Sequence, residues 1–225
     1  MEILISFIEK LKVMQKFILL LSLFICLSFD LSSQSLISVL NTNKVTPDVN
    51  LVEIEIENSL INWKGSNLFK LKKHYGTVNF KSGYVIKKNG NIMGGEFVIE
   101  MNTITNTDGK FNEILVSHLK NEDFFDVKKY PLAKLKINIV EFNMDETLKF
   151  IGDLTIKGVT KEIQFDASFN VIDGNEVMST KFEIDRTNWG INHESQETLG
   201  TLKDNIISNT IKFEVTAQWP FRDKC

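Results

Sequence analysis

The sequence predicts an all-β protein in which about eight antiparallel strands form a single domain. Apolar and polar residues alternate over most of the chain, which is typical of strands with one buried and one solvated face. Turn sequences such as Asn89-Gly90 and Asp173-Gly174 separate the alternating stretches. A helical period interrupts this pattern once, so a short helical insertion is predicted at about 109–127.

The first 33 residues are interpreted as a signal peptide. Residues 17–29 (FILLLSLFICLSF) are apolar, but this run is shorter than the roughly 20 residues that a membrane-spanning helix needs. Lys16 precedes the run and the small polar stretch 32–35 follows it, as in a signal peptide. Met14 is an alternative start. We therefore expect an exported protein, periplasmic or secreted, without an integral membrane span after cleavage.

Residues 34–50 are rich in Ser, Asn and Thr, and predict a flexible lead-in to one folded domain over residues 51–220. Cleavage would remove Cys26 and leave Cys225 at the end of the chain, so no internal disulfide is expected. Ile25 is not the small residue that a lipid-attachment site needs before its cysteine. The exported domain must therefore be held together by its own core.

Apart from a central hairpin, seven stretches alternate with a period of two. In the first, Val52 and Ile54 flank Glu53. In the fourth, the paired Gly94-Gly95 predict a bulge or a sharp bend. The predicted strands cover residues 52–57, 60–64 (a separate strand or the continuation of the first), 74–88, 92–102, 133–141, 177–186 and 206–219.

The helical insertion separates the fourth of these strands from the fifth. Apolar residues between Phe111 and Leu119 recur at i, i+3, i+4 and i+8, which predicts a helix over residues 109–120. Residues 121–127 predict a second short turn, which Tyr130-Pro131 would end.

The clearest strand pair is predicted for residues 148–171, with Phe150, Leu154 and Phe165 on one apolar face. A two-residue loop would place Phe150 opposite Phe165, and a four-residue loop would place it opposite Ala167. Both registers keep the apolar face continuous. About eight such strands form either a closed barrel or a sandwich, and composition does not choose between them.

Charge and motif content argue against several classes of function. The chain has 26 Lys and Arg against 29 Asp and Glu, a net charge of −3 and no basic patch, so no nucleic-acid partner is expected. The three histidines do not have metal-ligand spacing, and no phosphate loop or nucleophile motif is present. Neither a metal nor a catalytic residue is therefore predicted.

Some polar residues allow two interpretations. His118 with Asp123 and Asp126 resembles an acid–base set, but helix capping and loop solvation explain these residues more simply. Arg186, one of two arginines, either forms a structural ion pair or orients a polar head group. His74, at the start of a strand, is interpreted as a hydrogen-bonding residue of a barrel rim.

Two adjacent aromatic residues of the insertion, Phe124 and Phe125, also have two interpretations. On a helical turn both rings can reach a hydrophobic opening. They then either pack the insertion onto the barrel or control the entry of a ligand.

Several segments resemble YceI-like proteins and occur in the order typical of that family between about residues 59 and 219. Together they are far more specific than any one of them. The segments are Trp63-Lys64-Gly65, residues 74–77 (HYGT), 94–104 (GGEFVIEMNTI), 118–131 (HLKNEDFFDVKKYP), 152–161 (GDLTIKGVTK) and 185–191 (DRTNWGI).

The resemblance implies an extended, lipocalin-like barrel of eight antiparallel strands whose apolar lumen holds a long amphiphile. In the family this ligand is a polyisoprenoid chain, including polyprenyl quinones and related lipids, in exported bacterial proteins. The expected role of the protein is transport or storage of this lipid, or a stress response. The resemblance implies no catalytic residue, and no cofactor is expected besides a bound lipid or quinone. Trp189 and residues 192–195 depart from the family pattern, so the head group is the least transferable feature.

The predicted ligand contacts fall into two sets. The lumen residues share the apolar faces of the strands and are Phe80, Phe97, Ile99, Leu135, Ile137, Phe150, Leu154, Phe165, Phe169, Phe182 and Phe213. The mouth and head-group residues are His74, His118, Phe124, Phe125, Arg186 and Trp189.

Two alternatives stay open. A barrel with a packed core would serve as a structural or interaction module, and a lumen without room for a chain beside a large exposed apolar patch would favour it. An enzyme acting on a hydrophobic substrate through His118 and Asp126 would need a nucleophile that converges with them in one pocket. Formation of a homodimer is also left open.

Overall fold

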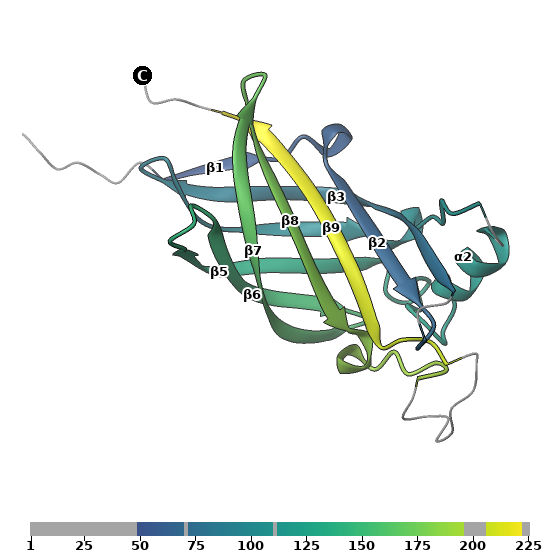
Figure 1. Ribbon diagram of the computed structural model, residues 1–225. Coiled ribbons are helices and arrows are strands. Elements are labelled where there is room, and N and C mark those ends of the chain that lie inside the picture. Colours follow the sequence, from purple (N-terminus) through teal and green to yellow (C-terminus); the bar gives the residue numbers. More distant parts are fainter. Residues whose placement is uncertain (1–48, 70–71, 110–111, 196–205, 222–225) are drawn as a thin grey trace, which may run out of the picture. The chain divides into compact units, whose positions relative to one another are not determined.

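The computed structural model describes residues 49–69, 72–109, 112–195 and 206–221, all within the compact unit Asp48–Cys225 (Figure 1). The predicted signal peptide lies outside these residues, so its cleavage stays a prediction. The strands are β1 (Val49–Glu53), β2 (Leu60–Ser66), β3 (Lys73–Lys88), β4 (Asn91–Glu100), β5 (Leu132–Phe142), β6 (Leu148–Ile156), β7 (Val159–Ile172), β8 (Asn175–Asp185) and β9 (Thr210–Pro220).

Eight of these strands close into an antiparallel barrel. The strands follow the order β3-β2-β9-β8-β7-β6-β5-β4, and β4 pairs back with β3. Closure leaves no free sheet edge around the ring, because every strand has two hydrogen-bonded neighbours. The predicted eight-stranded barrel is therefore confirmed, and the sandwich is excluded.

The short strand β1 lengthens the barrel wall without joining the ring as a separate member. β3 has 16 residues; its first part pairs with β2, and its last part, Tyr84–Lys88, pairs with β1 on the same edge. The 3-10 turn η1 (Ile56–Asn58) lies between β1 and β2. Glu55 N–H donates to Gln218 O at 2.8 Å, so β1 and β2 act as one interrupted strand between β3 and β9.

The central hairpin has the shorter of the two predicted loops. Lys157 and Gly158 have φ angles of 49° and 76°, the left-handed backbone of a two-residue hairpin turn. Phe150 consequently lies opposite Phe165. The same local geometry extends the apolar face of β6 onto β7.

Two other glycines lie where neighbouring strands approach closely or where their pairing is irregular. A Cβ on Gly152 would lie 2.3 Å from Lys136 O, so no other residue fits there without moving β5. Next to Gly94, the register of β3 and β4 shifts between Ile86 and Lys87, in agreement with the predicted bulge.

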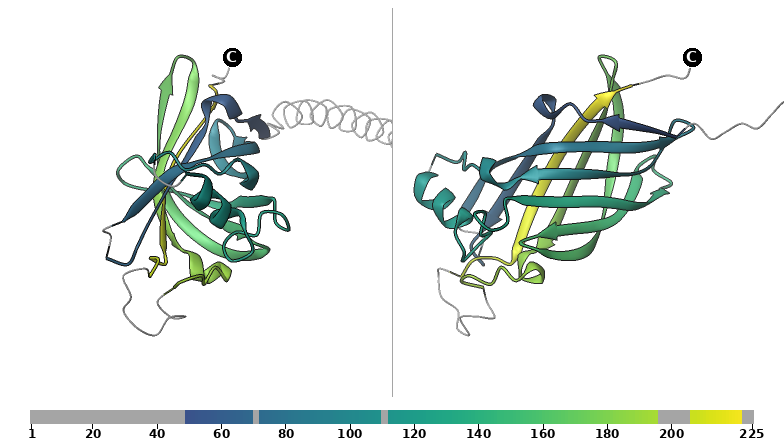
Figure 2. Two further views of the ribbon diagram at one scale, coloured as in Figure 1. Left: turned by 90° about the vertical axis from the view of Figure 1, so that its right-hand side faces the viewer. Right: turned by 180° about the vertical axis from the view of Figure 1, so that it is seen from behind.

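The two ends of the barrel differ. Tight turns join β3 to β4, β5 to β6 and β7 to β8 at one end, which we call the hairpin end. The other, which we call the helical end, carries the 3-10 turns η2 (Met101–Thr103) and η3 (Arg186–Trp189) and the helix α2 (Asn112–Lys120). Figure 1 shows α2 opposite the β3–β4 turn, and Figure 2 shows the helical end face on.

The predicted helical insertion is present at the helical end. α2 spans Asn112–Lys120, and turns follow it over residues 121–129. In the parts of the chain that the structure describes, no helix is both long enough and apolar enough to cross a membrane.

Candidate functional site

An apolar cavity of about 140 Å³ lies inside the barrel. All eight strands of the ring contribute to its wall, together with η2, α2 and η3. The lining residues are Ile61, Trp63, Gly65, Val78, Phe80, Phe97, Ile99, Met101, Ile104, Leu119, Phe124, Phe125, Ala133, Leu135, Phe150, Leu154, Ile156, Phe165, Met178, Thr180, Phe182, Arg186, Ile207, Ser208, Thr210, Ile211, Phe213 and Val215.

The cavity occupies only the half of the barrel nearer the helical end. On each strand from β3 to β9, the last lining residue toward the hairpin end is Phe80, Phe97, Leu135, Phe150, Phe165, Met178 and Val215, in that order. We call these seven residues the floor. Beyond the floor, buried side chains fill the barrel and do not reach the cavity, among them Val85, Ile137, Leu148, Ala167, Ala217 and Trp219.

A series of aromatic rings crosses from the hollow half into the packed half. The Phe213 and Phe182 rings stack at 5.3 Å, and the Phe182 and Phe165 rings stack at 4.9 Å. Phe165 meets Phe150 edge to face at 5.6 Å. The series continues through Phe169 to Trp219, with ring centroids 6.1 and 6.2 Å apart. We call these six residues the aromatic column.

The structure places nine of the eleven predicted lumen residues on the cavity wall. The two exceptions are Ile137, which is buried, and Phe169, which is partly buried. Both belong to the inward face of their strands but lie beyond the floor, so they contact packed side chains rather than the cavity. Alternation along a strand locates the inward face and does not show how far the hollow extends.

Arg186 is a fully buried cation at the helical end of the cavity. Its guanidinium lies 5.3 Å from the centre of the Phe124 ring, within the range of a cation–π contact. Its nitrogen atoms donate to four backbone carbonyls: Nε to Ser208 O at 3.1 Å, Nη1 to Ile191 O at 2.6 Å, and Nη2 to His193 O at 2.9 Å and Ile207 O at 3.2 Å.

These bonds tie η3 and the chain after it to the start of β9. Burial lowers the pKa of Arg186, while the charges of Asp185 and Glu194 act in the opposite direction. Most of its donors already have partners, so the described geometry gives Arg186 a structural role. Contact with a ligand head group stays a prediction.

The other predicted mouth residues, apart from His74, separate into three groups. Phe124 and Phe125, with ring centroids 5.0 Å apart, are buried and line the cavity. Trp189 is buried behind the wall, where its indole N–H donates to Leu154 O at 3.0 Å. His118 is exposed on α2 and does not line the cavity, because the inward position of that turn belongs to Leu119.

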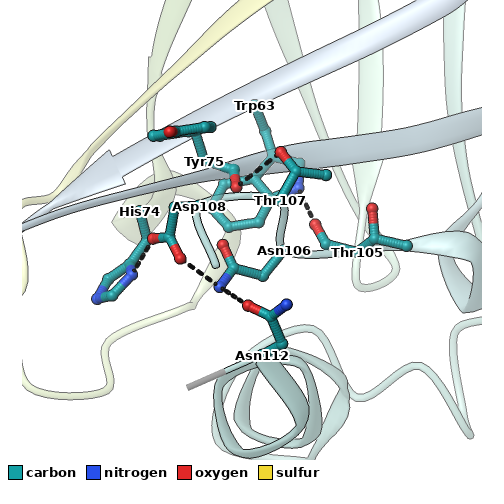
Figure 3. A network of polar contacts seen from close by, with 8 residues as sticks. All are labelled: Trp63, His74, Tyr75, Thr105, Asn106, Thr107, Asp108 and Asn112. Carbon is teal, nitrogen blue, oxygen red and sulfur yellow. Dashed lines mark hydrogen bonds and ion pairs between the residues drawn. The ribbon is translucent and has the colours of Figure 1, made fainter. Parts of the chain in front are cut away.

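His74 belongs to a polar network that holds the chain segment before α2 against β3 (Figure 3). His74 Nδ1 lies 2.6 Å from Asp108 Oδ2. Asn106 donates to Asp108 Oδ1 at 2.8 Å and to Asn112 Oδ1, at the start of α2, at 2.9 Å. The interpretation of His74 as a hydrogen-bonding rim residue agrees with this geometry.

The same segment crosses closely over β3. A Cβ on Gly76 would lie 1.8 Å from Thr105 O, and Trp63 Nε1 donates to that same oxygen at 3.1 Å. The glycine therefore lets the backbone carbonyl approach, and the indole satisfies it. Trp63 lines the cavity and was missed as a lumen residue, although its inward position follows from the alternation of β2.

Most of the remaining missed lining residues lie on strands, where alternation gives them inward positions, as it does for Val78 on β3; a smaller group comes from the connections at the helical end. Met101, Ile104 and Leu119 are buried on η2, the following segment and α2. Ile207 precedes β9. Strand alternation cannot identify such residues, because they reach the cavity through connections between elements.

The described residues lend no support to an acid–base pair. No side-chain hydrogen bond joins His118 to Asp126 in the described chain, and Asp126 has a left-handed backbone with φ of 48° in the turn after α2. Within the described ranges, no group of three or more His, Cys, Asp or Glu side chains is arranged to hold a metal ion.

Comparison with known proteins places this geometry in a family. The model of the YceI-like domain matches residues 53–219. A UPF0312 protein of Staphylococcus aureus strain MSSA476 is 36% identical over 116 residues, which cover 48% of this chain and 63% of that protein. A UPF0312 protein of Pseudomonas putida is 49% identical over 53 residues, or 24% of this chain and 28% of that protein. The match to the first relatives thus spans less than two thirds of their length.

Solved structures share the fold. Burkholderia cenocepacia BcnA superposes with a TM-score of 0.61 at 15% identity, covering 73% of this chain and 98% of that one. A polyisoprenoid binding domain from Saccharophagus degradans gives 0.53 at 15% identity, covering 77% and 100%. The match of the family model extends from β1 to β9 and includes the whole cavity wall. The chain therefore belongs to the YceI-like domain family.

Proposed function

We propose that the protein binds the apolar chain of an isoprenoid lipid, such as a polyprenyl quinone, in the hollow half of the barrel. The observation that carries this proposal is the apolar cavity wall. Among the described side chains that line it, only Thr180, Arg186, Ser208 and Thr210 are polar in type, apart from the bonded indole of Trp63. The description of a structural neighbour as a polyisoprenoid binding domain supports the same ligand class.

The driving force would be removal of the chain from water. Burial of apolar surface contributes about 25 cal/mol per Å², less the cost of ordering the chain and the protein. Thr180 Oγ1 already donates to Asp166 O at 2.6 Å, and Arg186 donates to carbonyls. The wall therefore presents few polar groups that a ligand must satisfy, and a hydrocarbon chain suits it better than a polar molecule.

The volume of the cavity sets a condition on this function. It is close to that of the roughly 150 Å³ apolar cavity that binds benzene in an engineered protein. A chain of several isoprene units must therefore displace side chains. Phe182 and Phe213 are placed to move, because they point inward and yet are only partly buried. Their movement would widen the hollow half toward the helical end.

The head group would stay at the helical end. Phe124 and Phe125 close the cavity there beside Arg186. Ser208, just before β9, and Thr210, the first residue of β9, add their hydroxyls to the wall. This arrangement favours a tail-first ligand with a small polar head near the protein surface. We further infer that the protein acts after export, as a carrier or store of the lipid.

Lipid extraction tests the proposed function. The protein purified from its own export route would be extracted and analysed by mass spectrometry. Lipid-free protein would be titrated with geraniol, farnesol and geranylgeraniol while tryptophan fluorescence is followed, to which Trp63 on the cavity wall contributes. We expect a copurified isoprenoid and saturable binding. Absence of lipid in repeated preparations, together with no binding of the three alcohols, would overturn the proposal.

A second function has one observation in its favour. Large apolar side chains are exposed at the hairpin end, among them Phe142 and Met144 near the β5–β6 turn and Val171 and Ile172 near the β7–β8 turn. Such residues suit an interaction module. A protein that binds no alcohol but assembles through this end in sedimentation experiments would be such a module.

A further inference from the structure

We propose that Phe150 and Phe165, in the floor of the cavity, set the length of the apolar chain that the barrel admits. The inference rests on the proposed function, since it concerns how far a bound chain can enter. It assigns to these two residues the role of stopping the end of the chain, in addition to their contact with the ligand.

The first argument is the position of the two rings. Phe150 and Phe165 lie directly opposite each other on β6 and β7 and meet edge to face at 5.6 Å. They are 3% and 8% exposed, although both line the cavity. Each ring thus has one side toward the hollow half and the remainder against packed side chains.

The second argument is the packing behind them. Trp219 and Ala217 are 0% exposed and Ala167 is 1% exposed, so this half of the barrel has close to the density of a protein core. The Trp219 indole N–H donates to Glu176 Oε2 at 2.9 Å, and Glu176 forms an ion pair with Lys87. A chain that passed the floor would have to break this arrangement.

The third argument is the contrast along the aromatic column. Phe182 and Phe213 are only partly buried and line the cavity, whereas Phe150 and Phe165 are almost fully buried. The rings near the helical end can therefore yield to a chain at lower cost than the rings of the floor. A chain entering from the helical end advances until its terminal carbon meets Phe150 and Phe165.

This geometry predicts a breakpoint in affinity. Each methylene that enters an apolar site tightens binding by about fourfold, which is the equivalent of the burial energy of one methylene. Affinity should rise with chain length until the chain reaches the floor. Further methylenes should add almost nothing, because they remain outside the cavity.

The test compares a homologous series of linear alcohols, from hexanol to hexadecanol, on the full chain and on Phe165→Leu. Leucine is smaller than phenylalanine but still apolar, so it should open space in the floor without adding a polar group. Phe150→Leu serves as a second variant if Phe165→Leu does not fold. We expect the breakpoint to move to an alcohol longer by one to three methylenes, with a gain in affinity of about fourfold for each added methylene.

The matched control is Phe169→Leu, which makes the same chemical change beyond the floor. It should lower the melting temperature and leave the breakpoint where it is in the parent chain. An unchanged breakpoint in the folded floor variants, or an equal movement in Phe169→Leu, would overturn the inference. A parent chain that binds none of the alcohols would instead contradict the proposed function itself.

Discussion

The two halves of this barrel have the same strands and the same alternation of side chains, but one half is hollow and the other is packed. In the hollow half, inward residues such as Phe182 and Phe213 are only partly buried. In the packed half, Trp219 fills the barrel and Lys87 and Glu176 form an ion pair beside it. A buried ion pair contributes little net stability when it is intact, but the loss of one partner is costly.

This difference shows how one wall can serve two purposes. The packed half supplies the buried contacts that keep the barrel closed without a disulfide in the described chain. The hollow half can then leave apolar side chains incompletely packed, at a cost in stability that a ligand would offset. Mutations in the packed half should therefore mainly reduce the free energy of unfolding, whereas mutations in the hollow half should mainly weaken ligand binding.

The largest expected difference in stability separates Trp219→Ala from Phe213→Ala. Loss of the fully buried indole should reduce the free energy of unfolding by about 4 kcal/mol, as for other large-to-Ala changes in cores. Phe213→Ala should cost about 1–2 kcal/mol, because part of that ring already faces a hollow. Urea denaturation of the two variants measures both values. Equal losses would show that the halves do not differ in packing.

A charge in the floor should abolish binding and also reduce stability. Phe165→Asp places a carboxylate among apolar rings, at a cost of roughly 3 kcal/mol, or forces the side chain to take up a proton. Binding of farnesol should fall below detection, whereas Phe165→Leu should retain it. Isothermal titration with both variants makes the comparison. Full binding by Phe165→Asp would mean that Phe165 does not face the ligand.

Breaking the ion pair of the packed half should have an intermediate effect. Lys87→Met leaves Glu176 without its cation in a largely buried position, which should cost about 2–3 kcal/mol. Combining Lys87→Met with Glu176→Gln should recover much of that loss, because no unpaired charge remains and the Gln amide oxygen can still accept from the Trp219 N–H. A double-mutant cycle by chemical denaturation checks this, and a double variant less stable than Lys87→Met would contradict it.

The smallest expected effect on stability is the pH dependence that arises from Glu55, which lies between β1 and η1. Hydrogen bonds from the side chains of Asn58, Gln218 and Asn175 lower the pKa of Glu55 from its ordinary value of 4.5. Because the folded-state pKa is the lower one, the stabilisation is present above 4.5 and is lost as pH falls through the folded-state value.

Glu55→Gln should therefore unfold more easily than the parent at neutral pH, and the two should converge in strong acid. Thermal melts across this range measure the difference. A constant gap at every pH would show that the hydrogen bonds, rather than the charge, stabilise this corner.

Much of the fold could be predicted from the sequence, because alternation is a local property. The sequence placed a turn at Lys157 and Gly158 and left two registers open, and the structure has the shorter loop, with Phe150 opposite Phe165. The family motifs added the closed barrel, which the alternation alone did not separate from a sandwich. Nine of the predicted lumen residues line the cavity for the same local reason.

The extent of the cavity could not be predicted. Ile137 and Phe169 have the inward orientation that their strands give them, yet they lie beyond the floor. At the helical end, the hydrogen bonds of Arg186 go to backbone carbonyls such as those of Ile191 and Ser208. His118 faces solvent one residue away from the buried Leu119. Each of these outcomes depends on residues that are distant in the sequence or on the rotation of a short helix.

By itself, the sequence determined which face of each strand is apolar, where the chain turns and where a helix interrupts the strands. The tertiary structure decided that the strands enclose a hollow at one end only. The physical reason is that side-chain direction in a strand depends on neighbouring peptide units, whereas the filling of a barrel depends on the summed size of side chains from all its strands. The Phe169 ring packs on the fully buried Trp219 in the packed half, whereas Phe213 and Phe124 line the cavity in the hollow half.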